Sequence, residues 1–334
     1  MKVANKNMNP RLSGFGQQSL KVGKKIFADY RIPLLAILLF IVMGFAAPRF
    51  QTPYNLYTIA DSAASSGIAA IGFTFILLVG QLDISFGSVI SLTSCVFMMM
   101  LKSGGDFWVA LIVALLLGCA CGAFTGFFVA NFRLSPFIVT MTMQLIYRGI
   151  ALAITSSTPV AMSHPTLRAI YEIKFFDIIP VSFVVFLVLA LVAEFVLRRT
   201  QYGRNLYLVG GNINTADNLG MKSNLYIWSA YIIQGLFAGI AGVAMMTRTF
   251  SANGNIGAQS LLNVIPMVIV GGTSMAGGKG GVVKTVFGVI LLSMVYNAMT
   301  FFSIPPMLQP FVKGLILCVV VVMDKYMERR HDKV

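Results

Sequence analysis

Charged side chains are scarce in this sequence, and acidic ones are the scarcest: Asp and Glu account for 11 of the 334 residues, against 25 Lys and Arg. Hydrophobic residues make up 57% of the chain, and the mean hydropathy is +0.83. A soluble domain carries charge on about a quarter of its residues, so this composition excludes one. The sequence therefore predicts a chain that lies mostly in lipid.

Histidine and cysteine are too few and too scattered to build a reactive centre. The 2 His are isolated, and the 4 Cys lie in apolar stretches without the paired spacing of a metal or redox site. Buried cysteines of this kind behave as small hydrophobic residues. We therefore expect no catalytic residue, no metal and no cofactor, and a membrane enzyme is the weakest alternative.

The excess of basic residues gives a formal charge of +14. A nucleic-acid-binding protein gathers such residues on one face or one domain, whereas here they are scattered between apolar runs. We expect no nucleic-acid partner. In a membrane protein, basic loops are instead the expected consequence of orientation.

Long apolar runs recur along the chain and predict an all-α polytopic membrane protein with about ten transmembrane helices. The first run resembles a signal-peptide core, but its long basic lead and the continuing apolar chain favour a retained helix. The predicted segments are 32–47, 60–79, 87–101, 107–130, 137–154, 178–197, 225–246, 261–270, 282–299 and 311–323.

The basic residues are distributed unevenly between the two sides of these ten segments. With the N-terminus inside, the inner segments carry 18 Lys and Arg and the outer segments carry 5. Positive residues favour the cytoplasmic side. This predicts a cytoplasmic tail at 1–31, a transmembrane domain at 32–323 with a cytoplasmic loop at 198–224, and a second cytoplasmic tail at 324–334.

The loop at 198–224 is the longest hydrophilic interruption between two apolar runs. We expect a flexible turn at Gly210 and Gly211, an N-cap at Asn212, a short helix over about 213–219, and a left-handed end at Gly220. A helix this short is not stable alone in water. We therefore expect another subunit to hold it in place.

Two glycine-rich segments, 79–88 and 271–281, interrupt the apolar pattern. Glycine permits sharp breaks, and irregular backbone at membrane depth is tolerated where protein or a water-filled cavity surrounds it. Asp83 is expected to cap the following helix or pair with a base, with solute contact and gating as alternatives. The predicted gating or helix-break residues are Asp83, Ser85, Gly87, Gly271, Gly272, Thr273, Gly277 and Gly278.

Other residues inside the apolar runs carry polar groups or allow close packing. Arg148, Gln144, Asn263 and Asn297 are candidates for a solute pathway, although bonding between helices is the alternative for each. Asp61 and Glu194 fall near the ends of predicted spans. There, contact with water explains why a carboxylate is tolerated. Glycines at four-residue intervals, at 118, 122 and 126 and again at 235 and 239, predict close helix packing.

Three of these stretches together carry a family resemblance. Gly203, Arg204 and Tyr207 followed by Gly-Gly-Asn at 210–212, the segment at 79–88 and the segment at 271–281 resemble the permeases of bacterial sugar importers driven by ATP-binding cassettes, the ribose-type family. The resemblance implies that a coupling helix docks on an ATPase. The residues it assigns to coupling are Arg204, Gly210, Gly211, Asn212, Ala216 and Gly220.

The resemblance also implies the partners and the location. These are a cassette ATPase, a second permease copy or a paralogue, a periplasmic or lipid-anchored sugar-binding protein and the lipid of the inner membrane, with helices two to five and seven to ten forming an inverted repeat. Our count of loops places both glycine-rich segments on one face, so they are not counterparts in that repeat. The segment 278–285 has the length of a phosphate-binding loop, but Val283 stands where glycine is required. ATP is therefore expected to bind on a separate protein.

The resemblance implies import of a monosaccharide, a pentose or hexose. The scarcity of charge in the spans agrees with this, because neutral polyols need hydrogen bonds but no fixed countercharge. The alternatives are a cassette-linked permease for an amino acid or a furanosyl signalling compound, and a transporter driven by an ion gradient. The outer loop at 155–177 is either a docking platform for the binding protein or a short interfacial helix.

Overall fold

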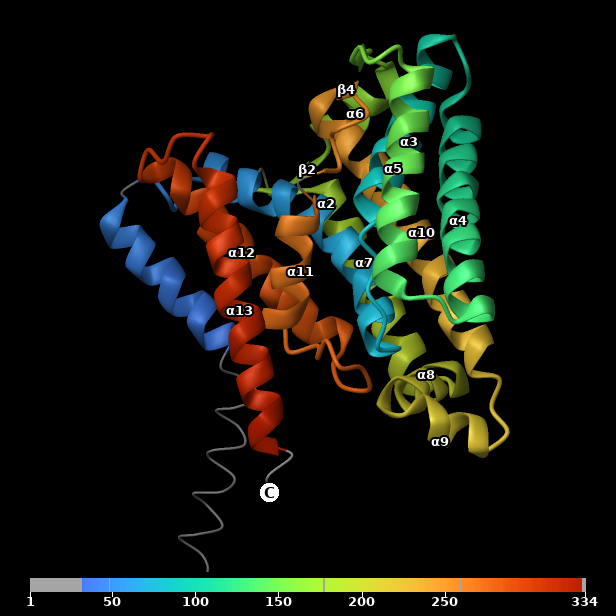
Figure 1. Ribbon diagram of the computed structural model, residues 1–334. Helices are drawn as coiled ribbons and strands as arrows, with labels where there is room; N and C mark the ends of the chain where they lie inside the picture. The colour runs from blue at the N-terminus through green and yellow to red at the C-terminus, as the bar shows by residue number, and fades with distance from the viewer. Residues whose placement is uncertain (1–31, 48, 177, 259, 332–334) are drawn as a thin grey trace, which may run out of the picture.

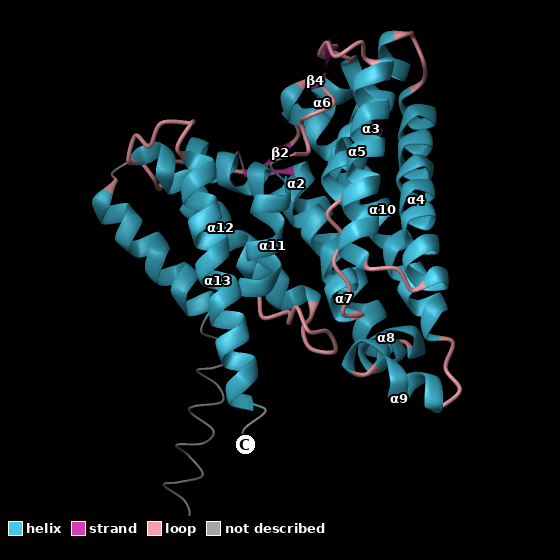
Figure 2. Ribbon diagram, in the orientation of Figure 1, coloured by secondary structure: helices cyan, strands magenta, loops and turns pink. Residues whose placement is uncertain are grey.

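The computed structural model describes residues 32–47, 49–176, 178–258 and 260–331, and these residues are predominantly helical (Figures 1 and 2). The predicted tail at 1–31 and residues 332–334 of the second predicted tail lie outside this range. The all-α prediction is confirmed.

Each of the ten predicted apolar segments contains a helix. Their bounds are Ile32–Ala46, α2 Pro53–Leu78, α3 Phe86–Lys102, α4 Phe107–Phe132, α5 Pro136–Ile154, α7 Val181–Arg199, α10 Ser223–Thr249, α11 Ser260–Val270, α12 Val282–Phe301 and α13 Gln309–His331. Among the described residues, α2, α4, α5, α7, α10 and α12 are long and apolar enough to cross a membrane, and the shorter apolar stretches are Ile32–Ala46, α3, α11 and the part of α13 at Gln309–Val322. That the other four predicted segments also cross the membrane stays a prediction.

Shorter elements join the long helices. They are α6 Pro165–Glu172, α8 Gln201–Gly211, α9 Ile213–Asn218, and the two-residue strands β1 Val160–Ala161, β2 Lys174–Phe175, β3 Ile179–Pro180 and β4 Ser251–Ala252. Strand β1 pairs with β4, and β2 with β3, both antiparallel. Helix α6 and β4 lie at the end of the molecule opposite α8 and α9 (Figure 1). The short helix expected as one alternative for the outer loop is therefore present.

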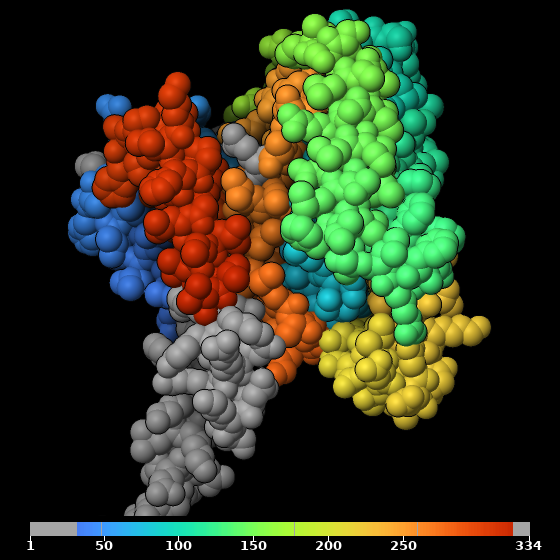
Figure 3. Space-filling view, in the orientation of Figure 1, coloured from blue at the N-terminus to red at the C-terminus, as the bar shows by residue number. Residues whose placement is uncertain are grey.

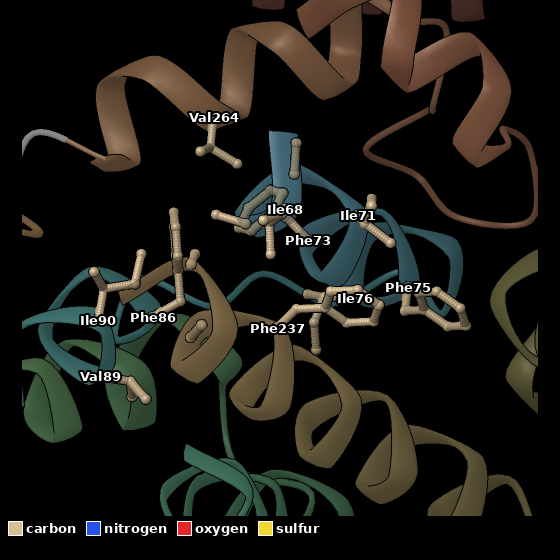
Figure 4. Close-up of a cluster of buried hydrophobic side chains, with 14 of the residues drawn as sticks. Ile68, Ile71, Phe73, Phe75, Ile76, Phe86, Val89, Ile90, Phe237 and Val264 are labelled. Carbon is tan, nitrogen blue, oxygen red and sulfur yellow. The ribbon is translucent and has the colours of Figure 1, made fainter. Parts of the chain in front are cut away.

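Helices α2 and α10 form the centre of the molecule and are mostly buried. Ile68, Phe73 and Ile76 of α2 are fully buried, and Phe237 of α10 lies beside them (Figure 4). Helix α4 packs along α10 with backbone against backbone, because a Cβ added to Gly235 would overlap the carbonyl oxygen of Gly118. The close packing predicted from the glycine spacing is confirmed.

Helices α4, α5 and α7 surround this centre and expose large apolar side chains. Leu116, Leu145 and Leu191, one on each helix, are 64%, 68% and 68% exposed. Water would disfavour so much apolar surface, whereas lipid accommodates it. These three helices therefore form a lipid-facing surface.

The order of a long helix, an irregular segment and a shorter helix occurs twice, as α2, 79–85 and α3, and again as α10, 250–258 and α11. The second irregular segment meets the first turn of α3, where Gly87 and Gly257 approach so closely that a Cβ on either would overlap the other's carbonyl oxygen. The amide of Gly257 also donates to Ser91 Oγ at 2.9 Å. In this order of elements 250–258 takes the place of the first glycine-rich segment, and the second glycine-rich segment lies in the turn between α11 and α12.

Candidate functional site

The three stretches singled out in the sequence come together at one end of the molecule. Gly210, near the end of α8, lies against the last turn of α2, where an added Cβ would overlap the carbonyl oxygen of Leu78. The same oxygen accepts a hydrogen bond from the amide of Gly278 at 2.9 Å. A Cβ on Gly277 would lie 2.8 Å from Gly80 Cα. Both glycine-rich segments therefore lie on one face of the molecule, as the loop count predicted. We call the contact of Gly80, Gly210, Gly277 and Gly278 the glycine junction.

Backbone conformation adds to the requirement for glycine in the junction. Gly277 and Gly278 have φ of +88° and +68°, a left-handed conformation that costs an L-residue about 1–2 kcal/mol. Since their neighbours are backbone atoms, a side chain could not rotate out of the way. The junction therefore holds the end of α2, the end of α8 and the loop before α12 as one unit.

Polar contacts reinforce this unit from α7 and α8. Glu194 Oε2 accepts hydrogen bonds from the amides of Val282 at 2.7 Å and Val283 at 3.2 Å, so that its carboxylate caps the N-terminus of α12. Glu194 also forms an ion pair with Arg198, one turn later. Glu194 therefore has a structural role, because it joins α7 to the start of α12. Our expectation that contact with water accounts for this carboxylate was wrong.

Tyr207 of α8 links the same two segments. Its hydroxyl donates to the carbonyl oxygen of Gly280 at 3.0 Å. Burial raises the pKa of Tyr207, and the nearby carboxylate of Glu194 raises the pKa further. The phenol thus stays protonated as a donor at neutral pH.

The loop between α7 and α10 has more helix than expected. Gly210 and Gly211 are the last two residues of α8 and do not form the flexible turn that we predicted. Glycine at 210 serves close approach rather than an unusual backbone angle, which is why the turn prediction was wrong. The other local predictions are confirmed: Asn212 Oδ1 accepts from the amide of Thr215 at 3.0 Å, and Gly220 has φ of +79°.

Helix α9 presents one face to the protein and one to solvent. Ala216 is 2% exposed and faces inward, so it is not available for direct contact with another subunit. Arg133 Nη2, just after α4, lies 3.1 Å from Asp217 Oδ2 and ties α9 to the membrane helices. The outward face consists of Asn214, Thr215, Asn218 and Leu219. Arg204 of α8 is also exposed. Helices α8 and α9 form a projecting knob, yellow in Figure 3.

The first irregular segment is closed by its own acidic residue. Asp83 is 4% exposed, and its Oδ1 accepts hydrogen bonds from the amide of Ser85 at 2.7 Å and from its hydroxyl at 2.6 Å. This contact organises the start of α3, in agreement with the structural role that we preferred. Gly87 then lies in the contact with Gly257.

The remaining residues of the second glycine-rich segment pack against α12. Gly271 lies against backbone, since an added Cβ would be 2.7 Å from Thr285 Cα. Thr285 Oγ1 in turn lies 2.9 Å from Thr74 Oγ1 of α2. Gly272 has φ of +92°, and Thr273 is fully buried. These residues fix the turn between α11 and α12.

The four pathway candidates do not come together. Arg148 Nε donates to Asn255 Oδ1 at 2.8 Å, and thereby holds the second irregular segment. Asn297 and Asn55 exchange hydrogen bonds of 2.9 and 3.1 Å, so Asn297 joins α12 to α2. Gln144 is half-buried on α5. Asn263 differs from the others, because it lines a cavity.

Sequence reasoning missed two contributors to the site. The caps from Glu194 depend on a helix that begins 88 residues later, although the spacing of Glu194 and Arg198, four residues apart, could have indicated their pairing. Asn255 lies in a segment whose irregular backbone was not recognised.

The apolar helices, the irregular segments between them and the projecting knob define a multi-pass membrane protein with the features of a permease. The family described as branched-chain amino acid transport system / permease component matches residues 55–321. The chain therefore belongs to this family of permease components.

Individual relatives cover nearly the whole chain. It is 31% identical over 297 residues to the ribose import permease protein RbsC of Escherichia coli K12, covering 87% of this chain and 92% of the relative. Identity to the D-allose transport system permease protein AlsC of the same organism is 30%, covering 89% and 91%. Identity to the L-arabinose ABC transporter permease protein AraH of Azospirillum brasilense is 28%, covering 90% and 88%. No solved structure matches the chain.

Proposed function

We propose that this chain is the transmembrane permease of an ATP-binding cassette importer and carries a monosaccharide, a pentose or hexose, across the inner membrane. The observation that carries the proposal is the glycine junction, which connects the knob of α8 and α9 rigidly to the ends of α2 and α12. A force applied to the knob would therefore move helices that reach the centre of the molecule. The names of the relatives, which import ribose, allose and arabinose, support the sugar.

In this proposal both termini are cytoplasmic and ten segments cross the membrane. The excess of Lys and Arg in the inner loops supports the orientation. An ATPase binds the outward face of α9 and the neighbouring Arg204 from the cytoplasm, and a second permease, a copy or a paralogue, completes the pathway. ATP-driven closure of the ATPases shifts the equilibrium between outward-facing and inward-facing states.

A sugar-binding protein, periplasmic or lipid-anchored, delivers the solute at the opposite end, where α6 and the two strand pairs lie (Figure 1). Leu167 anchors α6 because it is fully buried, while Arg168 and Glu172 are exposed and pair with each other at 3.0 Å. The exposed face of α6 is thus available for docking.

An ion-coupled transporter is the first alternative, and the carboxylates argue against it. Asp61 is buried, lies 3.5 Å from Arg248 Nε and accepts a hydrogen bond from Ser182 at 3.0 Å. Asp83 and Glu194 have the structural contacts given above. A proton or cation relay requires carboxylates that can change partners, whereas Asp61 and Glu194 join different helices and Asp83 is bound to Ser85 at the start of α3.

A permease for branched-chain amino acids is the second candidate, because that solute stands in the family's description. A zwitterionic amino acid needs countercharges along its path, whereas a neutral sugar does not. Arg148, the basic candidate for the pathway, is engaged with Asn255.

The test is uptake by proteoliposomes that contain the chain with its cassette ATPase and binding protein. We expect accumulation of D-ribose, D-allose or L-arabinose only when ATP is supplied on the ATPase side. Accumulation driven by an imposed ion gradient without ATP would contradict the cassette mechanism. Uptake of L-leucine in place of the sugars would favour the amino-acid permease.

A further inference from the structure

The cavity that Asn263 lines lies between α2, α3, α10, α11 and the second irregular segment. Its volume is about 100 Å³, well above the ~10–15 Å³ that one water molecule needs. Its walls are formed by Ser65, Ser66, Ala69, Ile90, Ala241, Met245, Ile256, Ser260 and Asn263.

The walls differ in chemistry. Ser65 and Ser66 of α2, with Ser260 and Asn263 of α11, provide hydroxyl and amide groups. Ile90, one turn after Gly87, and the nearby Ile256 provide apolar surface. A sugar ring has hydroxyl groups around its edge and C–H groups on its faces, so that a site with both kinds of wall matches it.

One polar atom of a cavity-lining residue has no protein partner. Asn263 Oδ1 is buried and accepts no hydrogen bond from any residue that the structure describes. Leaving such an acceptor unsatisfied is costly, and rotation of the side chain toward the cavity would let a hydroxylated solute supply the missing donor. Ser65 Oγ donates to the carbonyl oxygen of Ser62 at 3.4 Å, which leaves its oxygen free to accept.

The position of the cavity fits passage of a solute. It adjoins the contact between α3 and the second irregular segment, since an added Cβ on Gly257 would lie 3.1 Å from Ile90 Cβ. Two of its walls, α2 and α11, are connected to the glycine junction: α2 ends there, and α11 leads into the loop that contains Gly277 and Gly278. Movement of the knob would therefore change the width of the cavity.

We propose that this cavity is a binding site for the hydroxyl groups of a neutral monosaccharide in transit, with Asn263, Ser65 and Ser66 as the residues that contact the sugar. This binding site rests on the proposed function, and it names the residues that would contact the transported solute. The lining residues that the structure describes include no charged side chain, which favours a sugar over an amino acid at this point.

The test replaces Asn263 by Leu, which has a similar shape but no amide, in the importer reconstituted with its ATPase and binding protein. We expect the maximal uptake rate of D-ribose, D-allose or L-arabinose, whichever the wild type carries, to fall about tenfold, the effect of one hydrogen bond worth roughly 1.4 kcal/mol. ATP hydrolysis stimulated by the binding protein should stay within about twofold of the wild type. The control is Ser293→Ala, which removes a buried hydroxyl on α12 away from the cavity and should leave both rates unchanged.

A second measurement does not depend on transport rates. In a background without the native cysteines, Ser66→Cys should react with a small water-soluble thiol reagent, and the transported sugar should slow this reaction at least about threefold, whereas Ser293→Cys should stay unreactive because its site is buried. Wild-type sugar uptake together with normal uptake by Asn263→Leu and no protection at Ser66→Cys would overturn the site and leave the proposed function intact. Uptake of L-leucine by the wild type with no sugar uptake would overturn the proposed function itself.

Discussion

Gly210→Ala is expected to abolish ATP-dependent uptake, with a fall of more than about tenfold, equivalent to at least 1.4 kcal/mol, while the chain still inserts in the membrane. A single methyl group would overlap the carbonyl oxygen of Leu78 and approach the amide nitrogen of Gly278. All the atoms it meets belong to backbone, so that α8 must shift away from α2 and the junction opens. Uptake and ATP hydrolysis, measured in the same proteoliposomes, should become uncoupled.

The neighbouring glycine is a matched control for this variant. Gly211 is also a helical residue of α8, but an added Cβ there would have no atom within 4 Å. Gly211→Ala should therefore keep wild-type uptake, and even gain slightly in helix stability, since Ala is favoured over Gly by roughly 1 kcal/mol in a helix. Equal uptake by the two variants would mean that the junction does not transmit movement.

Glu194→Gln is expected to lower stability by about 1–3 kcal/mol, because the charged cap of α12 and the ion pair with Arg198 are lost together. The neutral amide has one acceptor oxygen for the amides of Val282 and Val283, and it cannot pair with the guanidinium. The midpoint of thermal unfolding of the detergent-solubilised protein should fall by several degrees.

Glu172→Gln on α6 controls for loss of negative charge alone. Glu172 also pairs with an arginine four residues away, but both side chains are more than 60% exposed. An exposed pair of this type contributes about 0.3–0.5 kcal/mol, so its loss should hardly move the unfolding midpoint. Equal shifts for the two variants would argue against a structural role for Glu194.

The positions of the membrane helices could be predicted from the sequence because an apolar run in lipid has few alternatives to a helix. The prediction of 107–130 for α4, observed as Phe107–Phe132, is an example, whereas the predicted 60–79 begins seven residues after the start of α2. Helix α8 was not predicted, since it contains Gly203, Gly210 and Gly211, which have low helix propensity. The protein uses two of these glycines for close contact: a Cβ on Gly203 would overlap the carbonyl oxygen of Leu197, and one on Gly210 would overlap that of Leu78. In α8, packing against other parts of the chain outweighs the low helix propensity of glycine.

The contacts within the candidate site could not be predicted from the sequence either. The motifs indicated which segments matter, but not that Gly80, Gly210 and Gly278 meet, because contacts between distant segments leave no periodic pattern. Nor could the sequence separate Asn263 from Asn297, two neutral amides in apolar helices. Asn297 has a partner in Asn55 and Asn263 Oδ1 has none among the described residues, a difference that depends on packing.

The central claim is that the outward face of α9 receives force from a separate ATPase in the cytoplasm. Leu219 is the most direct position to test, since it immediately follows α9 and is 70% exposed. Its buried neighbour Ala216 is the control.

The measurement is crosslinking of single-cysteine variants of the assembled importer with a short bifunctional reagent, applied separately from each side of the membrane. The account predicts that Leu219→Cys crosslinks to the ATPase when the reagent is added on the cytoplasmic side, and that Ala216→Cys does not. A cysteine at 219 that reacts only from outside the cell, or never crosslinks to the ATPase, would contradict it.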